Sequence, residues 1–294
     1  MRTDAWSYWI FEIKPDMKIY NNMKCAFCAL LSVLFALSVS AQELTVLHVN
    51  DTHSHIEAER SGKETGLGGV IEQAAYMGQV RDEAGKRNVL LLHAGDFGQG
   101  TSYFSELHGD IEISLLNAMK FDAACLGNHE FDNGMDELAR RLRSLKVPVV
   151  CANYDFAGTP LEKLVKPYVI VRKAGKKIGI IGLLTDVRDV VDGDIAALLK
   201  YEEPAAVVNR HAAYLKEVKG CDLVICLTHL GYEGESYTDP ELAADTRNVD
   251  VIVGGHSHTL LDSEKIFRNL DGEDVVIVTD WKWGMRVGRL TVDF

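Results

Sequence analysis

The sequence predicts an α/β protein in which two packed mixed sheets are flanked by helices. Apolar runs of strand length, such as 88–92, alternate along the chain with amphipathic segments of helix length, such as 70–84. Two further apolar runs, 168–171 and 177–184, are joined by Lys173-Ala174-Gly175-Lys176 and are typical of an antiparallel hairpin. A simple doubly wound sheet would not contain this hairpin, whereas two packed mixed sheets would accommodate it.

The remaining elements follow from the same patterns. Strands are expected at 43–50, 88–92, 123–126, 147–151, 223–227, 249–253, 274–279 and 285–294, with the last two completing the second sheet. Helices are expected at 70–84, 111–119, 135–145 and 204–218. The polar stretch 232–246 is expected to be a mobile segment that could border a substrate. No repeat or proline-rich linker divides the chain, so residues 42–294 are expected to form one domain.

Composition places the chain among globular proteins and limits its partners. Apolar residues make up 47% and charged residues 25% of the 294 residues, which is ordinary for a soluble domain. The formal net charge of −12 argues against binding a nucleic-acid backbone, since phosphate contacts need clustered lysine and arginine. A small anionic substrate can still bind if metal ions invert the local potential.

The N-terminal segment 1–41 is predicted to be a signal peptide with an upstream extension. The apolar run 26–39 follows lysines and ends at Ser40-Ala41, which are the small residues that a signal peptidase reads. Cleavage after Ala41 is therefore expected, with the domain in the periplasm or secreted and without a stable membrane anchor. An uncleaved anchor is the alternative, although the run is short for a membrane span. Met17 or Met23 could be the true start.

Four cysteines remain after the predicted cleavage. Cys125, Cys151 and Cys226 fall in apolar strand-like runs, where a free thiol behaves as a small hydrophobic group, and Cys221 lies just before one. Free thiols are the favoured interpretation over a disulfide. Their spacing does not match a zinc finger.

Five of the predicted strands end in side chains that bind metals. The residues at these ends are Asp51 and His53, Asp96, Asn128 and His129, His229, and His256 and His258. Strands of an open α/β sheet present their carboxyl ends at one edge, where ligands bind. Residues two apart, such as Asp51 and His53 or His256 and His258, point to the same side at a strand end. A single such histidine would more often be structural, but their joint occurrence indicates one dinuclear metal centre.

The donor set also limits the metal and the chemistry. Imidazole nitrogens, two carboxylates and an amide oxygen, without a thiolate, suit Zn, Mn, Fe or Mg rather than copper(I) or an iron–sulfur cluster. Two cations about 3.5 to 4 Å apart can clamp the attacking and leaving oxygens of a phosphoryl group and lower the pKa of a bridging water. The expected reaction is hydrolysis of a phosphate ester.

His129 is expected to stay free of metal and to face the phosphate, because its side chain should diverge from that of Asn128. Asp132 can accept a hydrogen bond from His129 and favour the imidazolium form, which could stabilise phosphate oxygens or protonate the leaving alkoxide. The alternative is that Asp132 caps the following helix, and the two roles are compatible. His55 and His108 are expected to be loop residues, and His93 a core residue or one supporting the metal ligands.

These motifs together resemble the calcineurin-like metallophosphoesterases. The strings Leu47-His48-Val49-Asn50-Asp51-Thr52-His53 and Gly127 to Gly134 resemble in particular the exported branch of 5′-nucleotidases, UDP-sugar hydrolases and 2′,3′-cyclic phosphodiesterases. The resemblance implies a four-layer α/β/β/α sandwich, two divalent metal ions and a His129–Asp132 catalytic dyad. It implies one metal held by Asp51, His53, Asp96 and His258, and another held by Asp96, Asn128, His229 and His256.

The resemblance leaves three functions open. The first is 5′-nucleotidase action on nucleotides. The second is a phosphodiesterase acting on cyclic nucleotides or nucleotide sugars. Members of this branch usually carry a second domain that stacks on the nucleobase, and the chain ends where that domain would begin. The third function is therefore a catalytic or scaffold subunit that works only with a separate nucleotide-binding polypeptide.

Overall fold

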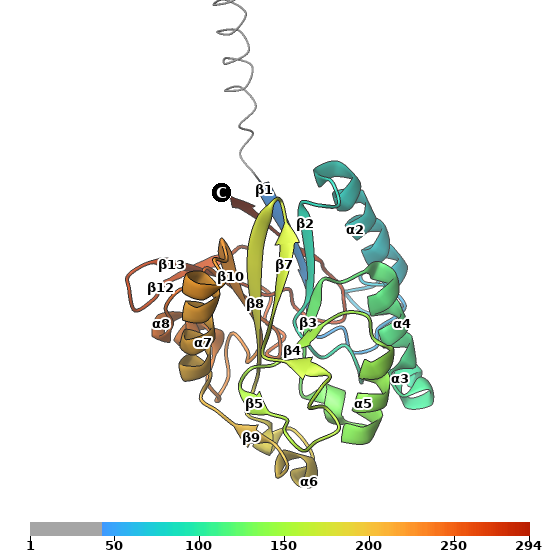
Figure 1. Ribbon diagram of the computed structural model, residues 1–294. Coiled ribbons are helices and arrows are strands. Elements are labelled where there is room, and N and C mark those ends of the chain that lie inside the picture. Colours follow the sequence, from blue (N-terminus) through green and yellow to red (C-terminus); the bar gives the residue numbers. More distant parts are fainter. Residues whose placement is uncertain (1–42) are drawn as a thin grey trace, which may run out of the picture. The chain divides into compact units, whose positions relative to one another are not determined.

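The structure is a computed structural model that describes residues 43–294 (Figure 1). The predicted signal peptide and its cleavage site at Ala41 lie outside the described residues. Within residues 43–294, no helix is both long and apolar enough to cross a bilayer.

Two six-stranded mixed sheets form the centre of the fold. The first has the order β14-β1-β2-β3-β4-β6 and consists of β1 (Glu43–Val49), β2 (Val89–His93), β3 (Ala123–Cys125), β4 (Val149–Val150), β6 (Val165–Lys166) and β14 (Gly288–Asp293). Its strands are parallel except for the antiparallel edge strand β14.

The second sheet has the order β12-β13-β11-β10-β8-β7. It consists of β7 (Tyr168–Lys173), β8 (Lys176–Leu184), β10 (Leu223–His229), β11 (Val251–Val253), β12 (Lys265–Arg268) and β13 (Asp274–Val278). Strands β7 and β8 form the predicted hairpin. The two edge strands β7 and β12 are antiparallel to their neighbours, and the four inner strands are parallel. A third, two-stranded sheet pairs β5 (Tyr154–Asp155) with β9 (Lys200–Tyr201).

Helices cover the outer faces of the two large sheets (Figure 1). Beside the first sheet lie α2 (Val70–Ala84), α3 (Ser102–Leu107), α4 (Asp110–Met119) and α5 (Met135–Ser144). Beside the second lie α7 (Pro204–Ala213), which continues into a π-helical turn at Tyr214–Val218, and α8 (Asp239–Asp245). The short helix α6 (Gly193–Ala196) lies near β9.

Alternating burial along the strands explains the layers. In β10, Ile225 and Leu227 pack between the two sheets, whereas Val224 and Cys226 pack against α7 and α8. Strand β2 follows the same alternation, since Leu90 and Leu92 face the second sheet and Leu91 packs with α2 and α4. Each sheet therefore buries both faces, which confirms the four-layer α/β/β/α sandwich.

Two sequence-based predictions were wrong. Strand β14 belongs to the first sheet, not the second, because it pairs antiparallel with the edge of β1, where Leu290 lies opposite Val46. The stretch 232–246 is not a continuous mobile loop. It contains α8, which a Thr238–Glu241 capping box initiates and whose Leu242 is fully buried. Helices α3 and α6 and strands β5, β6, β9 and β12 were not predicted.

All four cysteines in the described part of the chain are buried free thiols. Burial raises the pKa of Cys151 to about 12 and also raises that of Cys125 and Cys226 above its ordinary value. These thiols are therefore protonated and act as small apolar side chains in the core.

Candidate metal centre

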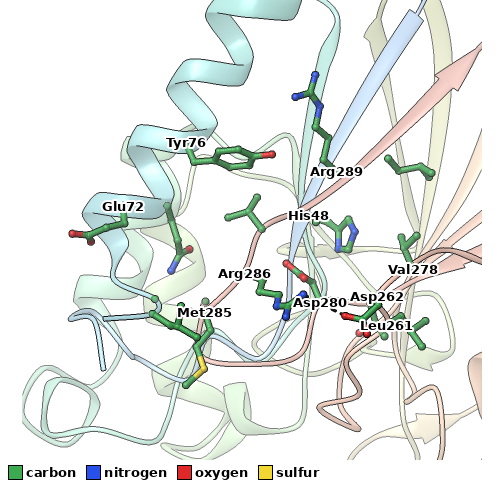
Figure 2. Close-up of a pocket in the computed structure, with 18 of the residues that line it drawn as sticks. His48, Glu72, Tyr76, Leu261, Asp262, Val278, Asp280, Met285, Arg286 and Arg289 are labelled. Atoms are coloured by element: carbon green, nitrogen blue, oxygen red, sulfur yellow. Dashed lines mark ion pairs between the residues drawn. The ribbon is translucent and has the colours of Figure 1, made fainter. Parts of the chain in front are cut away.

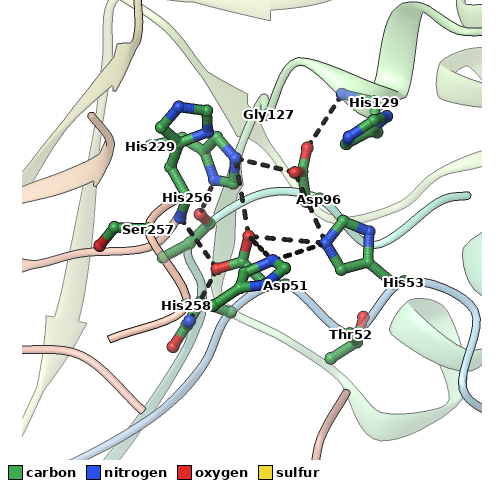
Figure 3. A network of polar contacts seen from close by, with 12 residues as sticks. Asp51, Thr52, His53, Asp96, Gly127, His129, His229, His256, Ser257 and His258 are labelled. Atoms are coloured by element: carbon green, nitrogen blue, oxygen red, sulfur yellow. Dashed lines mark hydrogen bonds and ion pairs between the residues drawn. The ribbon is translucent and has the colours of Figure 1, made fainter. Parts of the chain in front are cut away.

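The carboxyl ends of strands from both large sheets meet at one place (Figure 3). Asp51, Asp96 and Asn128 follow the adjacent strands β1, β2 and β3 of the first sheet. His229 is the last residue of β10, and His256 and His258 follow β11 in the second sheet. The face-to-face packing of the sheets therefore brings together side chains that are far apart in the sequence.

A first group of donor atoms consists of Asp51, His53 and His258. The Asp51 Oδ1 atom lies 3.3 Å from His258 Nε2 and 3.7 Å from His53 Nε2. The two Nε2 atoms of His53 and His258 are 3.0 Å apart. Three donor atoms, two from the loop after β1 and one from the loop after β11, thus point to a common position.

A second group consists of Asp96, His229 and His256. The Asp96 Oδ2 atom lies 3.0 Å from His229 Nε2, and the His229 and His256 rings have centroids 5.1 Å apart. The same Asp96 oxygen lies 3.8 Å from His53 Nε2 in the first group. Asp96 therefore lies between the two groups, in the place of a carboxylate that two cations would share.

Buried polar atoms without a hydrogen-bond partner indicate that the donor groups are suited to divalent cations. Asp51 Oδ1 and Asn128 Oδ1 are buried and accept no hydrogen bond from the described residues. A buried oxygen without a partner is costly, so its presence indicates a missing ligand. Burial lowers the pKa of His256 to about 4 and also lowers that of His53. These imidazoles are therefore neutral, as metal ligands must be.

The two carboxylates concentrate negative charge in this buried place. Burial alone would raise the pKa of Asp51 and of Asp96, but the neighbouring His229 holds both below the ordinary value. In turn burial opposes the charged form of His229, yet Asp96 and Asp51 raise its pKa to about 10. A cation bound beside these carboxylates would take the place of the His229 proton, because an imidazole that binds a metal is neutral.

The backbone is strained at most of the candidate ligands. Asp51, His53, Asp96, His256 and His258 have φ angles of 48°, 46°, 53°, 79° and 52°. This left-handed region is sparsely populated by residues other than glycine and costs about 1–3 kcal/mol at each position. The surrounding fold maintains this strain at the side chains that form the two groups, which is typical of a functional site.

His129 and Asp132 form the expected hydrogen bond. His129 Nδ1 lies 2.9 Å from Asp132 Oδ2, and this bond is the main reason why the pKa of His129 is raised. The His129 backbone N–H donates to Asp96 Oδ1 at 3.0 Å, and its ring centroid lies 5.4 Å from that of His53. The alternative that Asp132 caps the next helix is wrong, because α5 has Gly134 at its N-cap and no side-chain cap.

The three histidines that the sequence placed in loops or in the core lie outside the two donor groups. His93 is buried on β2, where its Nε2 lies 3.0 Å from Thr52 Oγ1. His55 lies 2.9 Å from Glu59 and stacks on Trp283 with centroids 4.3 Å apart. His108 ends α3.

Two residues of the quoted motifs have contacts that the sequence did not reveal. Asn50 Nδ2 donates to Asp51 Oδ2 at 2.7 Å and to the carbonyl of Trp281 at 2.7 Å, which fixes the orientation of the Asp51 carboxylate. Glu130 is fully buried and accepts backbone hydrogen bonds around Asp96. The sequence contains only weak signals for these two roles: Asn50 directly precedes the candidate ligand Asp51, and Glu130 lies within the Gly-Asn-His-Glu string.

A large cavity lies apart from the candidate metal centre. It has a volume of about 630 Å³ and is lined by residues of α2, β1 and β14 and by the segment around Asp280 (Figure 2). His48, Tyr76, Asp280 and Arg289 are among its lining residues, and none of the residues in the two donor groups lines it. The convergence of donor atoms, rather than cavity size, identifies the candidate centre.

The fold and the site define a class of protein: an α/β/β/α sandwich with a candidate dinuclear metal centre at the strand ends. The calcineurin-like phosphoesterase family matches residues 44–260, and the chain belongs to this family.

Relatives and solved structures carry more specific names. The chain is 35% identical to a protein named "Probable 5′-nucleotidase" of Treponema pallidum, over 86% of this chain and 45% of that protein. It is 33% identical to the NAD 5′-nucleotidase of Haemophilus influenzae, over 86% of this chain and 45% of that protein. The crystal structure of a 5′-nucleotidase precursor from Thermus thermophilus superposes with a TM-score of 0.77 at 37% identity, covering 86% of this chain and 51% of that one. The chain thus spans about half the length of these relatives.

Proposed function

We propose that this chain hydrolyses phosphate esters with two divalent metal ions, and that its preferred substrates are nucleoside 5′-phosphates. The observation that carries the proposal is the pair of donor groups, Asp51/His53/His258 and Asp96/His229/His256, with Asp96 between them. Membership of the calcineurin-like phosphoesterase family and relatives named as 5′-nucleotidases support the substrate class.

The residues divide into two overlapping ligand sets. Asp51, His53, Asp96 and His258 would hold one cation. Asp96, Asn128, His229 and His256 would hold the other. When bound, Zn, Mn, Mg or Fe ions at these positions would neutralise phosphate oxygens and lower the pKa of a water nucleophile.

His129 and Asp132 would act on the substrate rather than on the metals. Asp132 binds Nδ1 of His129, which leaves Nε2 free, and it favours the protonated ring. An imidazolium next to the Asp96 loop can donate a hydrogen bond to a phosphate oxygen or a proton to the leaving alkoxide. The side chain of His129 is about a third exposed, so a substrate can reach it.

Substrate assays of the purified chain test this proposal. AMP, NAD, 2′,3′-cyclic AMP, UDP-glucose and an aryl phosphate would each be supplied with Mn, Zn or Mg, and the products would be separated and quantified by chromatography, because cleavage of a diester or pyrophosphate bond releases no free phosphate. We expect metal-dependent hydrolysis with AMP as the best substrate. Higher kcat/KM for the cyclic nucleotide or UDP-glucose would support the phosphodiesterase alternative. Metal-independent turnover, or no turnover of any ester, would contradict the proposal.

The third possible function is that of a subunit that works together with a separate nucleotide-binding polypeptide. Remote binding energy from a nucleobase supports catalysis at the phosphate, so a partner that binds the base should raise kcat on AMP but not on an aryl phosphate.

We also propose that the protein is exported to the periplasm or the medium after cleavage following Ala41, which leaves the domain 42–294. N-terminal sequencing of the exported protein would test this proposal.

A further inference from the structure

Glu130 makes an unusual set of contacts beside the candidate metal centre. Its side chain is fully buried, and its two oxygens accept hydrogen bonds from four backbone N–H groups. Oε2 accepts from Asp96 at 2.9 Å and from Gly127 at 2.6 Å. Oε1 accepts from Phe97 at 3.0 Å and from Gly98 at 3.1 Å. One carboxylate therefore binds the loops that follow two neighbouring strands.

These bonds hold Asp96 in its strained position. The Asp96 backbone has a φ of 53°, and its own N–H is one of the four donors to Glu130. Asp96 Oδ1 accepts from the N–H of His129, so the loop carrying Glu130 holds one oxygen of the shared carboxylate as well. Only Oδ2 is left to face His229 and His53, at 3.0 Å and 3.8 Å.

Four N–H groups directed at one buried carboxylate form a preorganised anchor. Each of these bonds satisfies a backbone N–H group that would be costly to bury without a partner, and the low local dielectric strengthens the bonds. A second anchor fixes Glu130 itself, since Arg141 Nη2 donates to its carbonyl oxygen at 2.9 Å. The loop geometry thus depends on protein contacts that need no metal.

We infer that Glu130 is a positioning residue whose carboxylate sets Asp96 between the two donor groups and so determines the affinity of both metal positions at once. The inference rests on the proposed function only in requiring that the centre binds metal. Residues that orient metal ligands typically contribute 10–100-fold to metal affinity, and Asp96 contacts both groups.

The variant Glu130→Gln tests the inference, because its amide can replace one oxygen but places N–H groups against two of the four donors. Glu112→Gln is the matched control, since Glu112 is also a buried glutamate but accepts none of these four bonds. Equilibrium dialysis against Mn, with metal measured by mass spectrometry, should show both positions of Glu130→Gln weakened about 10- to 100-fold and Glu112→Gln unchanged. Unchanged affinity in folded Glu130→Gln, or loss at one position only, would overturn the inference.

Hydrogen exchange of the wild-type protein decides the question if Glu130→Gln does not fold. The amides of Asp96, Phe97, Gly98 and Gly127 should be protected in the metal-free protein as strongly as with Mn, because Glu130 already binds them. Free exchange of these amides until Mn is added would mean that the metal organises the loop, and the inference would fail. Neither measurement uses a substrate. A chain that binds two Mn ions but hydrolyses no ester would therefore refute the proposed function and leave this inference intact.

Discussion

The Oδ2 atom of Asp96 lies 3.0 Å from the Nε2 atom of His229, although the two residues lie at the ends of strands in different sheets. This contact connects the two halves of the sandwich at the point where their parallel strands end. The same oxygen is within 3.8 Å of His53, so one carboxylate reaches both donor groups (Figure 3). The expected effects of substitutions follow from this shared position.

Asp96→Ala should abolish metal-dependent turnover and weaken both metal positions. Supporting residues alone contribute 10–100-fold to metal affinity, so loss of a shared ligand should cost at least about 100-fold. Metal content after dialysis and phosphate release from AMP measure the effect. Asp136→Ala, which removes an exposed carboxylate on α5, should retain both. Two metals still bound to Asp96→Ala would contradict the role of this residue.

His129→Ala should reduce the rate while both metals stay bound. A positioned proton donor contributes about 10²–10⁴-fold, so kcat on AMP should fall within that range. His55→Ala serves as the control, because His55 lies outside the donor groups and stacks on Trp283. If His129→Ala instead empties a metal position, His129 is a ligand and its proposed role is wrong.

His256→Ala and His258→Ala should each remove a ligand from a different group. The two histidines are two residues apart but lie with Asp96 and Asp51, respectively. Each variant should retain about one tightly bound Mn, and the spin coupling between two Mn ions, seen by electron paramagnetic resonance, should disappear in both. Retention of the coupled signal in either variant would be inconsistent with two separate groups.

Gly127→Ala should disturb the centre through packing alone. A Cβ atom at this position would overlap the Asp96 carboxylate and the Asp96 backbone nitrogen. Such overpacking costs about 1–3 kcal/mol of unfolding free energy, and here it would also displace the shared ligand. Gly78→Ala in α2 is the matched control, because a Cβ there meets nothing within 4 Å and should stabilise the helix by roughly 0.5–1 kcal/mol. Calorimetry and Mn titration would measure both effects, and equal Mn affinity in the two variants would contradict the prediction.

Asp280 should make the protein less stable as the pH rises. Burial raises its pKa from 3.8 to about 7, against the opposing effect of Arg286. Since the folded state holds the proton more tightly, the stabilising contribution is complete below pH 3.8 and is lost as the pH rises through 7. Between pH 5 and 8 this loss should be about 1–3 kcal/mol.

Asp280→Asn cannot ionise, so its Tm should fall less over this pH range than that of the wild type. The exposed Asp262→Asn, at the same cavity, should behave like the wild type (Figure 2). Differential scanning fluorimetry from pH 5 to 8 measures the three slopes. Identical slopes for Asp280→Asn and the wild type would show that this carboxyl does not determine the pH dependence.

Local patterns predicted the elements that carry the centre. The amphipathic segment 70–84 coincides with α2, and the apolar runs before Asp51, Asp96 and His229 are β1, β2 and β10. These strands are long or fully buried, so hydrophobicity alone identifies them. The position of β14 could not be predicted, because both sheets have an edge that accepts an antiparallel strand and the choice depends on tertiary packing.

The sequence also indicated the candidate metal-binding residues, but it did not indicate the residues that hold them in position. Polar residues directly after apolar strands indicated Asp51, Asp96 and His256. The role of Glu130 depends on N–H groups from two loops that meet only in the folded chain. The left-handed backbone of Asp96 is likewise held by these contacts, and that of Asp51 by the hydrogen bond from its N–H to the carbonyl of Gly95, rather than by the local sequence.

The most direct test of the central proposal is anomalous diffraction from a crystal of this chain grown with Mn. We predict two peaks about 3.5 to 4 Å apart. One should lie within bonding distance of Asp51, His53 and His258 and the other near His229 and His256, with Asp96 bound to both. A single peak, or two peaks that do not share Asp96, would contradict the proposed dinuclear centre.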